Sequence, residues 1–215
     1  MTTDVFIYDG IRTPFGKYGG SLVGVRPDDL AAHLIGAMID RHPSLDPSRV
    51  GEVVLGNANG SGEDNRNVAR MAALLAGMPV SVPAVTVSRP PGSSLEATIQ
   101  AARQVALGES TVVLACGVES MSRAPWVLPK PERAYPAGNA ELVSTALGWR
   151  LVNPSMPAEW TVTLGEGTEQ LRERYDVSRD AQDAFALSSH HLASAAWDAG
   201  FYDRQVVPVP GVVAP

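Results

Sequence analysis

Short apolar runs alternate with amphipathic segments along the first half of the chain. Runs rich in β-branched and aromatic residues, each the length of a strand, occupy residues 4–9, 50–55, 82–87 and 111–115. Segments with apolar residues at helical spacing lie between them, at residues 28–42, 67–75 and 92–107. Strands that alternate with helices favour parallel pairing through right-handed crossovers. The sequence therefore predicts an α/β fold in which helices cover a sheet of mostly parallel strands.

The boundaries of these elements carry residues with strong local preferences. Asp28 or Asp29 is expected to cap the first helix, because a carboxylate accepts hydrogen bonds from the free N–H groups there. His42 and Pro43 should close that helix, since the residue before a proline disfavours the helical region. The continuous apolar run at residues 111–115 is typical of a strand that is covered on both faces.

The character of the chain changes at Glu119, after which prolines interrupt every candidate element for about 40 residues. Helical spacing returns at residues 166–175, and a longer helix is expected to open at Ser178 and to stop at Gly200. Two prolines restrict residues 206–209 to an edge strand or a terminus. We therefore interpret the region from residue 119 onward as an insertion and not as another crossover unit.

Composition and charge exclude several classes of function. A net charge of −6 over 215 residues gives no electrostatic case for nucleic-acid binding. Cys116 is the only cysteine, which excludes an internal disulfide and a zinc site built on several thiolates. The four histidines have no carboxylate or thiol partner at ligand spacing, so no metal site is predicted. Without a long apolar stretch or a leader-like start, we expect a cytoplasmic protein with no membrane contact.

Several phrases of the sequence carry a family resemblance. Residues 12–20 (RTPFGKYGG), 62–70 (GEDNRNVAR) and 117–125 (GVESMSRAP) follow one another in the order and spacing of the first half of a thiolase. Residues 147–154 (LGWRLVNP) and 178–186 (SRDAQDAFA) are most similar to the 3-oxoadipyl-CoA thiolases of aromatic-acid degradation. The chain therefore resembles the N-terminal half of that family over essentially its whole length.

The resemblance implies a domain organisation. Residues 1–118 would be an incomplete N-terminal α/β domain, and residues 119–215 an incomplete loop-domain insertion. The C-terminal thiolase domain is expected to be absent. In the family, that domain supplies two histidines and a second cysteine.

The start of the helix at residues 92–107 is where the resemblance places the chemistry. Thiolases have an Asn-Arg-x-Cys-(Gly/Ala)-Ser-Gly pattern there, whose thiol takes the acyl group, whereas residues 88–94 read SRPPGSS. Pro91 therefore occupies the nucleophile position, in what we expect to be the first turn of the helix, and it has no atom that forms a thioester. Ser93 and Ser94 are the replacement nucleophiles to consider, although serine commonly caps helices and its hydroxyl needs a strong base.

Two other sets of residues bear on the site. Cys116 falls where the family usually has a small residue, so it is expected to be a buried apolar side chain. The resemblance implies coenzyme A contacts for Arg123, Arg150 and Arg172. It also implies one for Leu164, which opens a phrase that in the family lies near the pantetheine. The alternative for each arginine is the usual one, a solvated surface residue.

Two hypotheses for function stay open. The first is a thiolase-family acyl-CoA acyltransferase, acting on a coenzyme A thioester without a covalently bound cofactor, as in fatty-acid β-oxidation and aromatic degradation. The substitution at Pro91 predicts that this chain is inactive. The alternative is a non-catalytic fragment that binds acyl-CoA or another subunit. The resemblance also implies a homodimer through the edge of the strand at residues 82–87.

Overall fold

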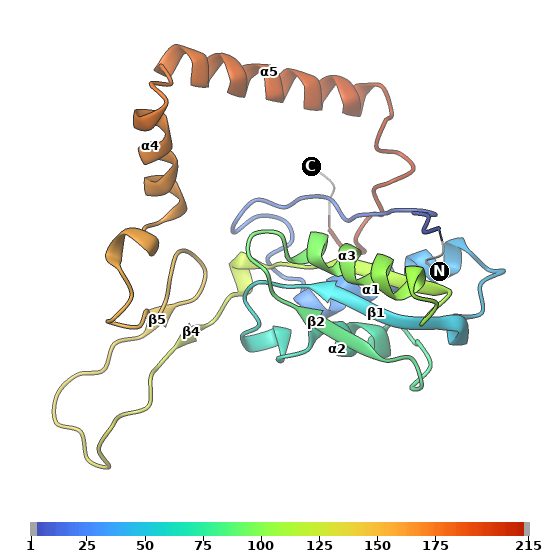
Figure 1. Ribbon diagram of the computed structural model, residues 1–215, viewed down its shortest axis with the longest axis horizontal. Helices are drawn as coiled ribbons and strands as arrows, with labels where there is room; N and C mark the ends of the chain where they lie inside the picture. The colour runs from blue at the N-terminus through green and yellow to red at the C-terminus, as the bar shows by residue number, and fades with distance from the viewer. Residues whose placement is uncertain (1–3, 213–215) are drawn as a thin grey trace. The chain divides into compact units, whose positions relative to one another are not determined.

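The computed structural model describes residues 4–212, which form two compact units. Unit 1 comprises residues 4–125 together with 206–212, and unit 2 comprises residues 126–205. Figure 1 shows the elements of both units in chain order, and each unit is described separately below.

A sheet of three parallel strands forms the centre of unit 1. The strands are β1 (Val50–Gly56), β2 (Ala84–Val87) and β3 (Val112–Gly117), and their order in the sheet is β2-β1-β3. Val54 of β1 is in register with Val85 of β2 and with Ala115 of β3. The parallel-rich α/β fold predicted from the sequence is therefore confirmed.

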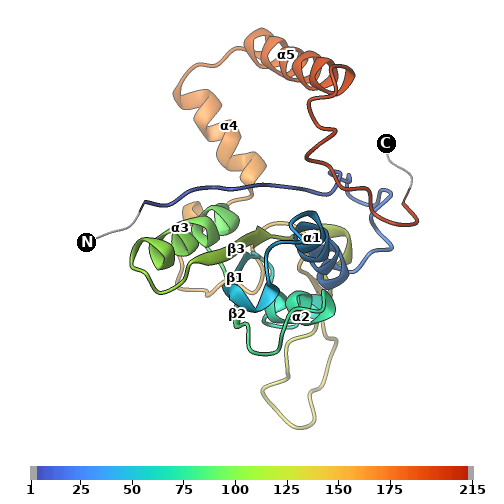
Figure 2. The ribbon, with the colours of Figure 1, turned by 90° about the vertical axis from the view of Figure 1, so that its right-hand side faces the viewer.

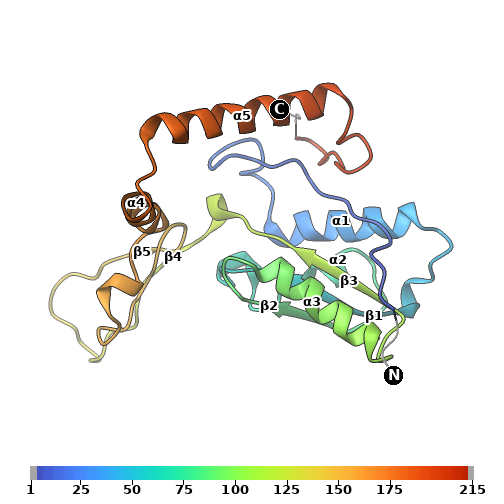
Figure 3. The ribbon, with the colours of Figure 1, turned by 45° about the horizontal axis from the view of Figure 1, so that its top comes forward.

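Three helices cover the two faces of this sheet. They are α1 (Pro27–Arg41), α2 (Val68–Leu75) and α3 (Ser93–Ala106). The sheet lies between α3 on one side and the pair α1 and α2 on the other (Figure 2). Figure 3 shows α3 running along β1 and β3. Three short 3₁₀ helices occupy the connections, at Pro47–Arg49, Gly62–Asp64 and Met121–Arg123.

The core of unit 1 follows from the alternation of side chains along β1. Val53 and Leu55 are fully buried in the cluster formed with α1 and α2, whereas Val54 points to the face that α3 covers. On the α2 side the cluster is built mainly from small residues, which allow helix and sheet to approach closely. The α3 side is closed by two buried alanines, Ala97 and Ala101.

The strand expected at residues 4–9 was a wrong prediction. Residues 4–11 are assigned to no strand, and Phe6, Ile7 and Tyr8 are each more than 80% exposed. Asp9 holds the segment through His42, with the carboxylate oxygen 2.9 Å from the imidazole Nε2. A strand requires a neighbouring ladder, and the apolar pattern alone cannot supply one.

Residues 206–209 form only an isolated parallel bridge, between Val206 and Arg12. The prolines limit pairing there, as the sequence indicated.

Two further expectations need correction. β3 is an edge strand of the described sheet and is only partly buried, because it has β1 on one side alone. The N-cap of α1 is Arg26 with Pro27 in the first position, so Asp28 and Asp29 lie inside the helix.

Unit 2 has little regular structure before its two helices. A two-residue antiparallel pair joins β4 (Trp126–Val127) to β5 (Val143–Ser144), and a 3₁₀ turn follows at Ala158–Trp160. The helices α4 (Leu164–Arg174) and α5 (Arg179–Asp198) lie where the sequence predicted them, each with a hydroxyl N-cap. Neither helix contains a buried residue.

Candidate functional site

The first turn of α3 lies directly on the carboxyl ends of β1 and β3. A Cβ atom added at Gly56 would lie 2.2 Å from the Ser94 amide nitrogen, and one added at Gly117 would lie 2.6 Å from the Ser94 Cβ. Glycine at the end of each strand therefore permits this close approach. In parallel α/β sheets, the carboxyl ends of the strands are the usual place for a ligand site.

Pro91 lies just outside the helix. α3 begins at Ser93, with Gly92 as its N-cap, so Pro91 belongs to the preceding turn and not to the first helical turn as expected. The Pro90–Pro91 peptide bond is cis, and Pro91 is exposed. The position thus combines access from solvent with a nearby helix N-terminus, but its side chain is chemically inert.

The two serines beside it are in different environments. Ser93 is 6% exposed, and its Oγ accepts a hydrogen bond of 3.0 Å from the Arg89 backbone N–H. Ser94 is exposed, with its Cβ facing Gly117. Among residues 4–212, neither hydroxyl has a hydrogen bond with an imidazole or a carboxylate. A serine nucleophile needs such a base to remove its proton.

Cys116 lies in β3, one residue before the end of the strand, and packs against the core cluster. Desolvation by burial raises the pKa of its thiol to about 12. The group is therefore protonated at neutral pH and is a poor nucleophile. This agrees with the apolar role expected from the sequence.

A buried polar network connects the ends of β1 and β3, and sequence reasoning missed it. Asn57 is 2% exposed; its amide donates to the Val118 carbonyl at 2.9 Å and accepts from the Gly60 N–H at 2.7 Å. The Glu119 carboxylate accepts from the Ala58 N–H at 2.8 Å. The signal in the sequence was the polar loop that follows β1.

Asp64 belongs to the same network. It is 5% exposed, and burial raises the pKa of its carboxyl, with a further contribution from the charge of Glu119. Asn65 and Arg66, which follow it, both have left-handed backbone conformations, with φ of 47° and 65°. Such conformations cost free energy in non-glycine residues and are enriched at functional sites.

Arg123 is a structural arginine of unit 1. Its Nε and Nη2 atoms donate to the two oxygens of Glu63, both at 2.5 Å, and its Nη1 donates to the Val23 carbonyl at 3.0 Å. Arg26 also pairs with Glu63, at 3.2 Å. These contacts join the turn-rich loop before α1 to the segment after β3. Any phosphate bound by Arg123 would compete with them.

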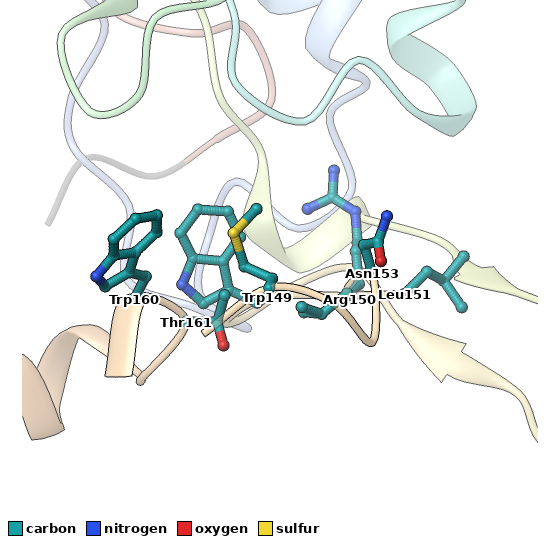
Figure 4. Close-up of a pocket in the computed structure, with 8 residues that line it drawn as sticks. Trp149, Arg150, Leu151, Asn153, Trp160 and Thr161 are labelled. Carbon is teal, nitrogen blue, oxygen red and sulfur yellow. The ribbon is translucent and has the colours of Figure 1, made fainter. Parts of the chain in front are cut away.

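Unit 2 contains a pocket of about 410 Å³. Its lining is largely apolar, with Arg150 as the one cationic side chain: Trp149, Arg150, Leu151, Val152, Asn153, Met156, Trp160 and Thr161. Figure 4 shows how the side chains line this space. Of the residues singled out from the sequence, Arg150 alone lines it.

Leu164 and Arg172 lie on α4, outside that lining. Leu164 is 86% exposed at the first position of the helix. Arg172 pairs with Glu169 at 2.7 Å and with Glu173 at 3.0 Å. The coenzyme A contacts expected of these two residues thus fall on an exposed helix.

The histidines show one difference from the sequence expectation. His42 does have a carboxylate partner, Asp9, which is distant in sequence and could not be found by local spacing. His33 lies 2.9 Å from the Pro208 carbonyl. Over residues 4–212, no group of three or more His, Cys, Asp or Glu side chains is arranged to hold a metal ion. Within the same residues, no helix is long and apolar enough to cross a membrane.

The family of the protein follows from these features together with comparison to known proteins. A parallel α/β unit, in which a helix starts on the glycine ends of two strands, is joined to an inserted unit. The sequence profile described as "Thiolase, N-terminal domain" matches residues 5–214. The chain belongs to the thiolase family.

Individual relatives refine this placement. The chain is 49% identical to the beta-ketoadipyl-CoA thiolase of Pseudomonas knackmussii, over 97% of this chain and 52% of the relative. It is 47% identical to the 3-oxoadipyl-CoA/3-oxo-5,6-dehydrosuberyl-CoA thiolase of Escherichia coli K12, over 96% and 51%. The crystal structure of the Bacillus anthracis acetyl-CoA acetyltransferase matches with a TM-score of 0.81 at 36% identity, over 92% of this chain and 48% of that one. The chain thus spans about half the length of the relatives it matches.

Proposed function

We propose that this chain binds a 3-oxoacyl-CoA thioester of the 3-oxoadipyl type, as a thiolase-family protein that forms no acyl-enzyme at the start of α3. The names of two similar relatives support the substrate class. In this proposal residues 1–118 correspond to the N-terminal α/β domain of a thiolase and residues 119–215 to its loop domain. Thiolysis and condensation as such are therefore not assigned to this chain.

One observation carries the proposal: Pro91 stands where the resemblance places the nucleophile. The thiolase reaction needs a thiolate, and the helix N-terminus would favour one by lowering a thiol pKa. The single thiol of the sequence, Cys116, is instead in a strand and has a raised pKa. Ser93 is buried, and its hydroxyl is engaged by the Arg89 N–H.

Intact mass spectrometry after incubation with acetoacetyl-CoA tests this directly. We expect the mass of the wild-type chain to be unchanged. Pro91→Cys should gain one acetoacetyl group, mapped to position 91, because an exposed thiol beside a helix N-terminus can exchange with the thioester and release coenzyme A. The gain in the variant would show that the position is accessible to a thioester.

Two serine variants make the test decisive. An acetyl group on the wild-type protein that disappears in Ser93→Ala or Ser94→Ala would identify a serine nucleophile and refute the proposal. An acetyl group on Cys116 would refute it equally. Binding of acetoacetyl-CoA is measured separately, by calorimetry on the wild-type chain, and its absence would contradict the binding part.

The coenzyme A contacts of Arg123, Arg150, Leu164 and Arg172 are part of the same proposal. The three arginines provide cations that phosphate groups favour. The ion pairs of Arg123 and Arg172 would have to open or share their donors on binding. Calorimetry on each arginine-to-glutamine variant shows which arginine binds coenzyme A. Loss of an arginine that contacts coenzyme A should weaken binding and leave the fold intact.

A second candidate function is a subunit-pairing module, and the edge of β2 favours it. The Pro83 and Val87 carbonyls accept hydrogen bonds from Val53 and Asn57, so residues 84 and 86 face away from β1. The Asn67 side-chain amide donates a hydrogen bond of 3.1 Å to the Ala84 carbonyl. The backbone groups of residue 86, at the end of this edge, are left to pair with a second copy. Light scattering should give the mass of a homodimer; a monomer at all concentrations would exclude this pairing.

A further inference from the structure

The loop after β1 contains a chemically labile dipeptide, Asn59–Gly60. Asparagine is among the thermolabile residues of proteins, and Asn59 alone of the asparagines in this sequence is followed by glycine. Glycine has no side chain to obstruct an approach of its own backbone nitrogen to the asparagine side chain before it. Gly60 has a left-handed backbone, with φ of 65°, and is exposed, whereas Asn59 is half-buried. Water therefore reaches the dipeptide.

The reaction open to this dipeptide is deamidation through a cyclic imide. After hydroxide removes the Gly60 N–H proton, the nitrogen forms a bond to the Asn59 Cγ. The Cγ–Nδ2 bond breaks, and Nδ2 leaves as ammonia with a proton from water, which regenerates hydroxide. Water then opens the imide at the side-chain carbonyl, which gives aspartate, or at the main-chain carbonyl, which gives isoaspartate. Either product has a carboxyl group where Asn59 had a neutral amide.

The fold holds the nitrogen that would attack. The Gly60 N–H donates a hydrogen bond of 2.7 Å to the Asn57 Oδ1. Asn57 is 2% exposed, and its own amide donates to the Val118 carbonyl at 2.9 Å, so the acceptor is fixed in place. The buried Asp64 carboxyl also accepts a hydrogen bond from the Gly60 N–H. Hydroxide removes a proton held by two buried acceptors only after the loop opens locally, so deamidation in the folded chain has to wait for that opening.

A second dipeptide with a following glycine, Asp9–Gly10, is protected in another way. An aspartate forms the same imide only when its carboxyl is protonated, because the oxygen has to leave as water. Hydrogen bonds from the Gly10 N–H and from His42 lower the pKa of the Asp9 carboxyl, so it is ionised at neutral pH. The chemistry therefore favours residue 59 over residue 9.

We infer that Asn59 is a deamidation site whose rate is set by the hydrogen bond between the Gly60 N–H and Asn57. The new carboxylate would lie in the loop where the Glu119 carboxylate already accepts from the Ala58 N–H at 2.8 Å. Repulsion between like charges, and in isoaspartate one added backbone atom, would disrupt the polar network that connects the ends of β1 and β3. Deamidation is thus a one-way change beneath the start of α3. It is independent of the proposed function, because no thioester takes part.

Peptide mass mapping of the full chain during incubation in mildly alkaline buffer tests the inference. Conversion of amide to carboxyl is followed at each asparagine, in the folded protein and in the urea-unfolded protein. We expect Asn59 to convert first in the unfolded chain, and at least about tenfold more slowly in the folded chain. Asn57→Ala should raise the folded rate by about tenfold, the factor that one ordinary hydrogen bond accounts for. Asn59→Gln is the matched control and should stay unconverted over the same time, since its longer side chain closes a less favourable ring.

Hydrogen exchange at the Gly60 N–H measures the hydrogen bond apart from the chemistry. This N–H should be protected in the wild type and should exchange fast in Asn57→Ala, while the amides of β1 stay protected and show that the variant is folded. Where Asn57→Ala unfolds as a whole, the wild type decides in urea below its unfolding transition. There the exchange of Gly60 and the conversion of Asn59 should rise together.

Four results would overturn the inference. They are another asparagine that converts first in the unfolded chain, a folded chain that converts as fast as the unfolded one, a rate that a folded Asn57→Ala leaves unchanged, and fast exchange of the Gly60 N–H in the wild type. The effect on the network has its own test. Asn59→Asp should lower the midpoint of thermal unfolding, and Glu119→Gln in that background should restore part of the loss. A midpoint equal to that of the wild type would overturn this effect.

Discussion

Unit 1 and unit 2 of this chain are ordered by different interactions. In unit 1, β1 is fully buried at Val53, Val54 and Leu55 between helices on both faces. In unit 2, Thr145 is the only buried residue of positions 126–205. Tertiary burial therefore stabilises the first unit, whereas local interactions must account for most of the order of the second.

The helices of unit 2 show what those local interactions are. The hydroxyl of Thr163 accepts from the Glu166 N–H at the start of α4, and Ser178 accepts from the Ala181 N–H at the start of α5. Along α5, the large apolar side chains of Phe185, Leu187, Leu192 and Trp197 are all more than half exposed. The comparison teaches that correct helix signals in a sequence do not imply a buried face.

The largest expected effect comes from one substitution made in each unit. Leu55→Ala should destabilise the protein by roughly 2–5 kcal/mol, because it removes a fully buried side chain and leaves a cavity. Leu192→Ala on α5, where the leucine is 69% exposed, should change stability by less than about 0.5 kcal/mol. Urea unfolding of both variants measures the difference. Comparable losses would show that α5 is buried in solution and would erase the contrast between the units.

A glycine in each unit gives the next largest contrast. Gly56→Ala places a methyl group against the Ser93 and Ser94 backbone and should cost about 1–3 kcal/mol, since backbone cannot yield as a side chain does. Gly167→Ala, inside α4, meets only Val162 at 3.9 Å and should stabilise by up to about 1 kcal/mol. Thermal unfolding should therefore move in opposite directions. A neutral Gly56→Ala would mean that the start of α3 is not fixed on β1.

These contrasts also explain which parts of the fold could be predicted from the sequence. Helices and their ends depend on local signals, so the hydroxyl cap at Ser178 and the glycine stop at Gly200 were predicted correctly. Strands depend on partners distant in sequence, so residues 4–9 were wrongly assigned to a strand and β3 was wrongly expected to be covered on both faces. Burial of β3 depends on the order of strands in the sheet, which no local pattern contains.

The same reasoning applies to the candidate site. Residues 88–94 placed Pro91 beside the start of α3 correctly, because this signal is local in the sequence. The prediction was wrong only in counting Pro91 as part of the first helical turn. The Asn57 and Asp64 network was missed, since it forms only when the ends of β1 and β3 lie side by side. The partnership of His42 with Asp9 was missed for the same reason.

Ion pairs offer a smaller contrast between the units. Arg123→Gln in unit 1 removes a two-pronged contact with Glu63 that is only partly solvated and should cost roughly 1 kcal/mol. Arg179→Gln in unit 2 breaks an exposed pair with Asp183 and should lie within experimental error. Chemical unfolding at low and high salt measures both. Equal effects would indicate that Arg123 contributes no more than a surface charge.

The finest distinction lies between two buried carboxyls of unit 1, and it appears as opposite pH dependence. Burial raises the pKa of Asp64 above the ordinary 3.8, so its protonated form is favoured by folding and its contribution to stability falls as pH rises from 3.8 through the raised value. Burial also acts to raise the pKa of Asp28, but the hydrogen bonds and the charge of Arg26 outweigh burial and lower that pKa. The contribution of Asp28 to stability is therefore lost as pH falls from 3.8 through the lowered value. Unfolding free energies of Asp64→Asn and Asp28→Asn, measured against the wild type between about pH 3 and pH 7, should therefore diverge with opposite sign. Parallel profiles would mean that Asp64 is solvated and that the network at the ends of β1 and β3 is open to water.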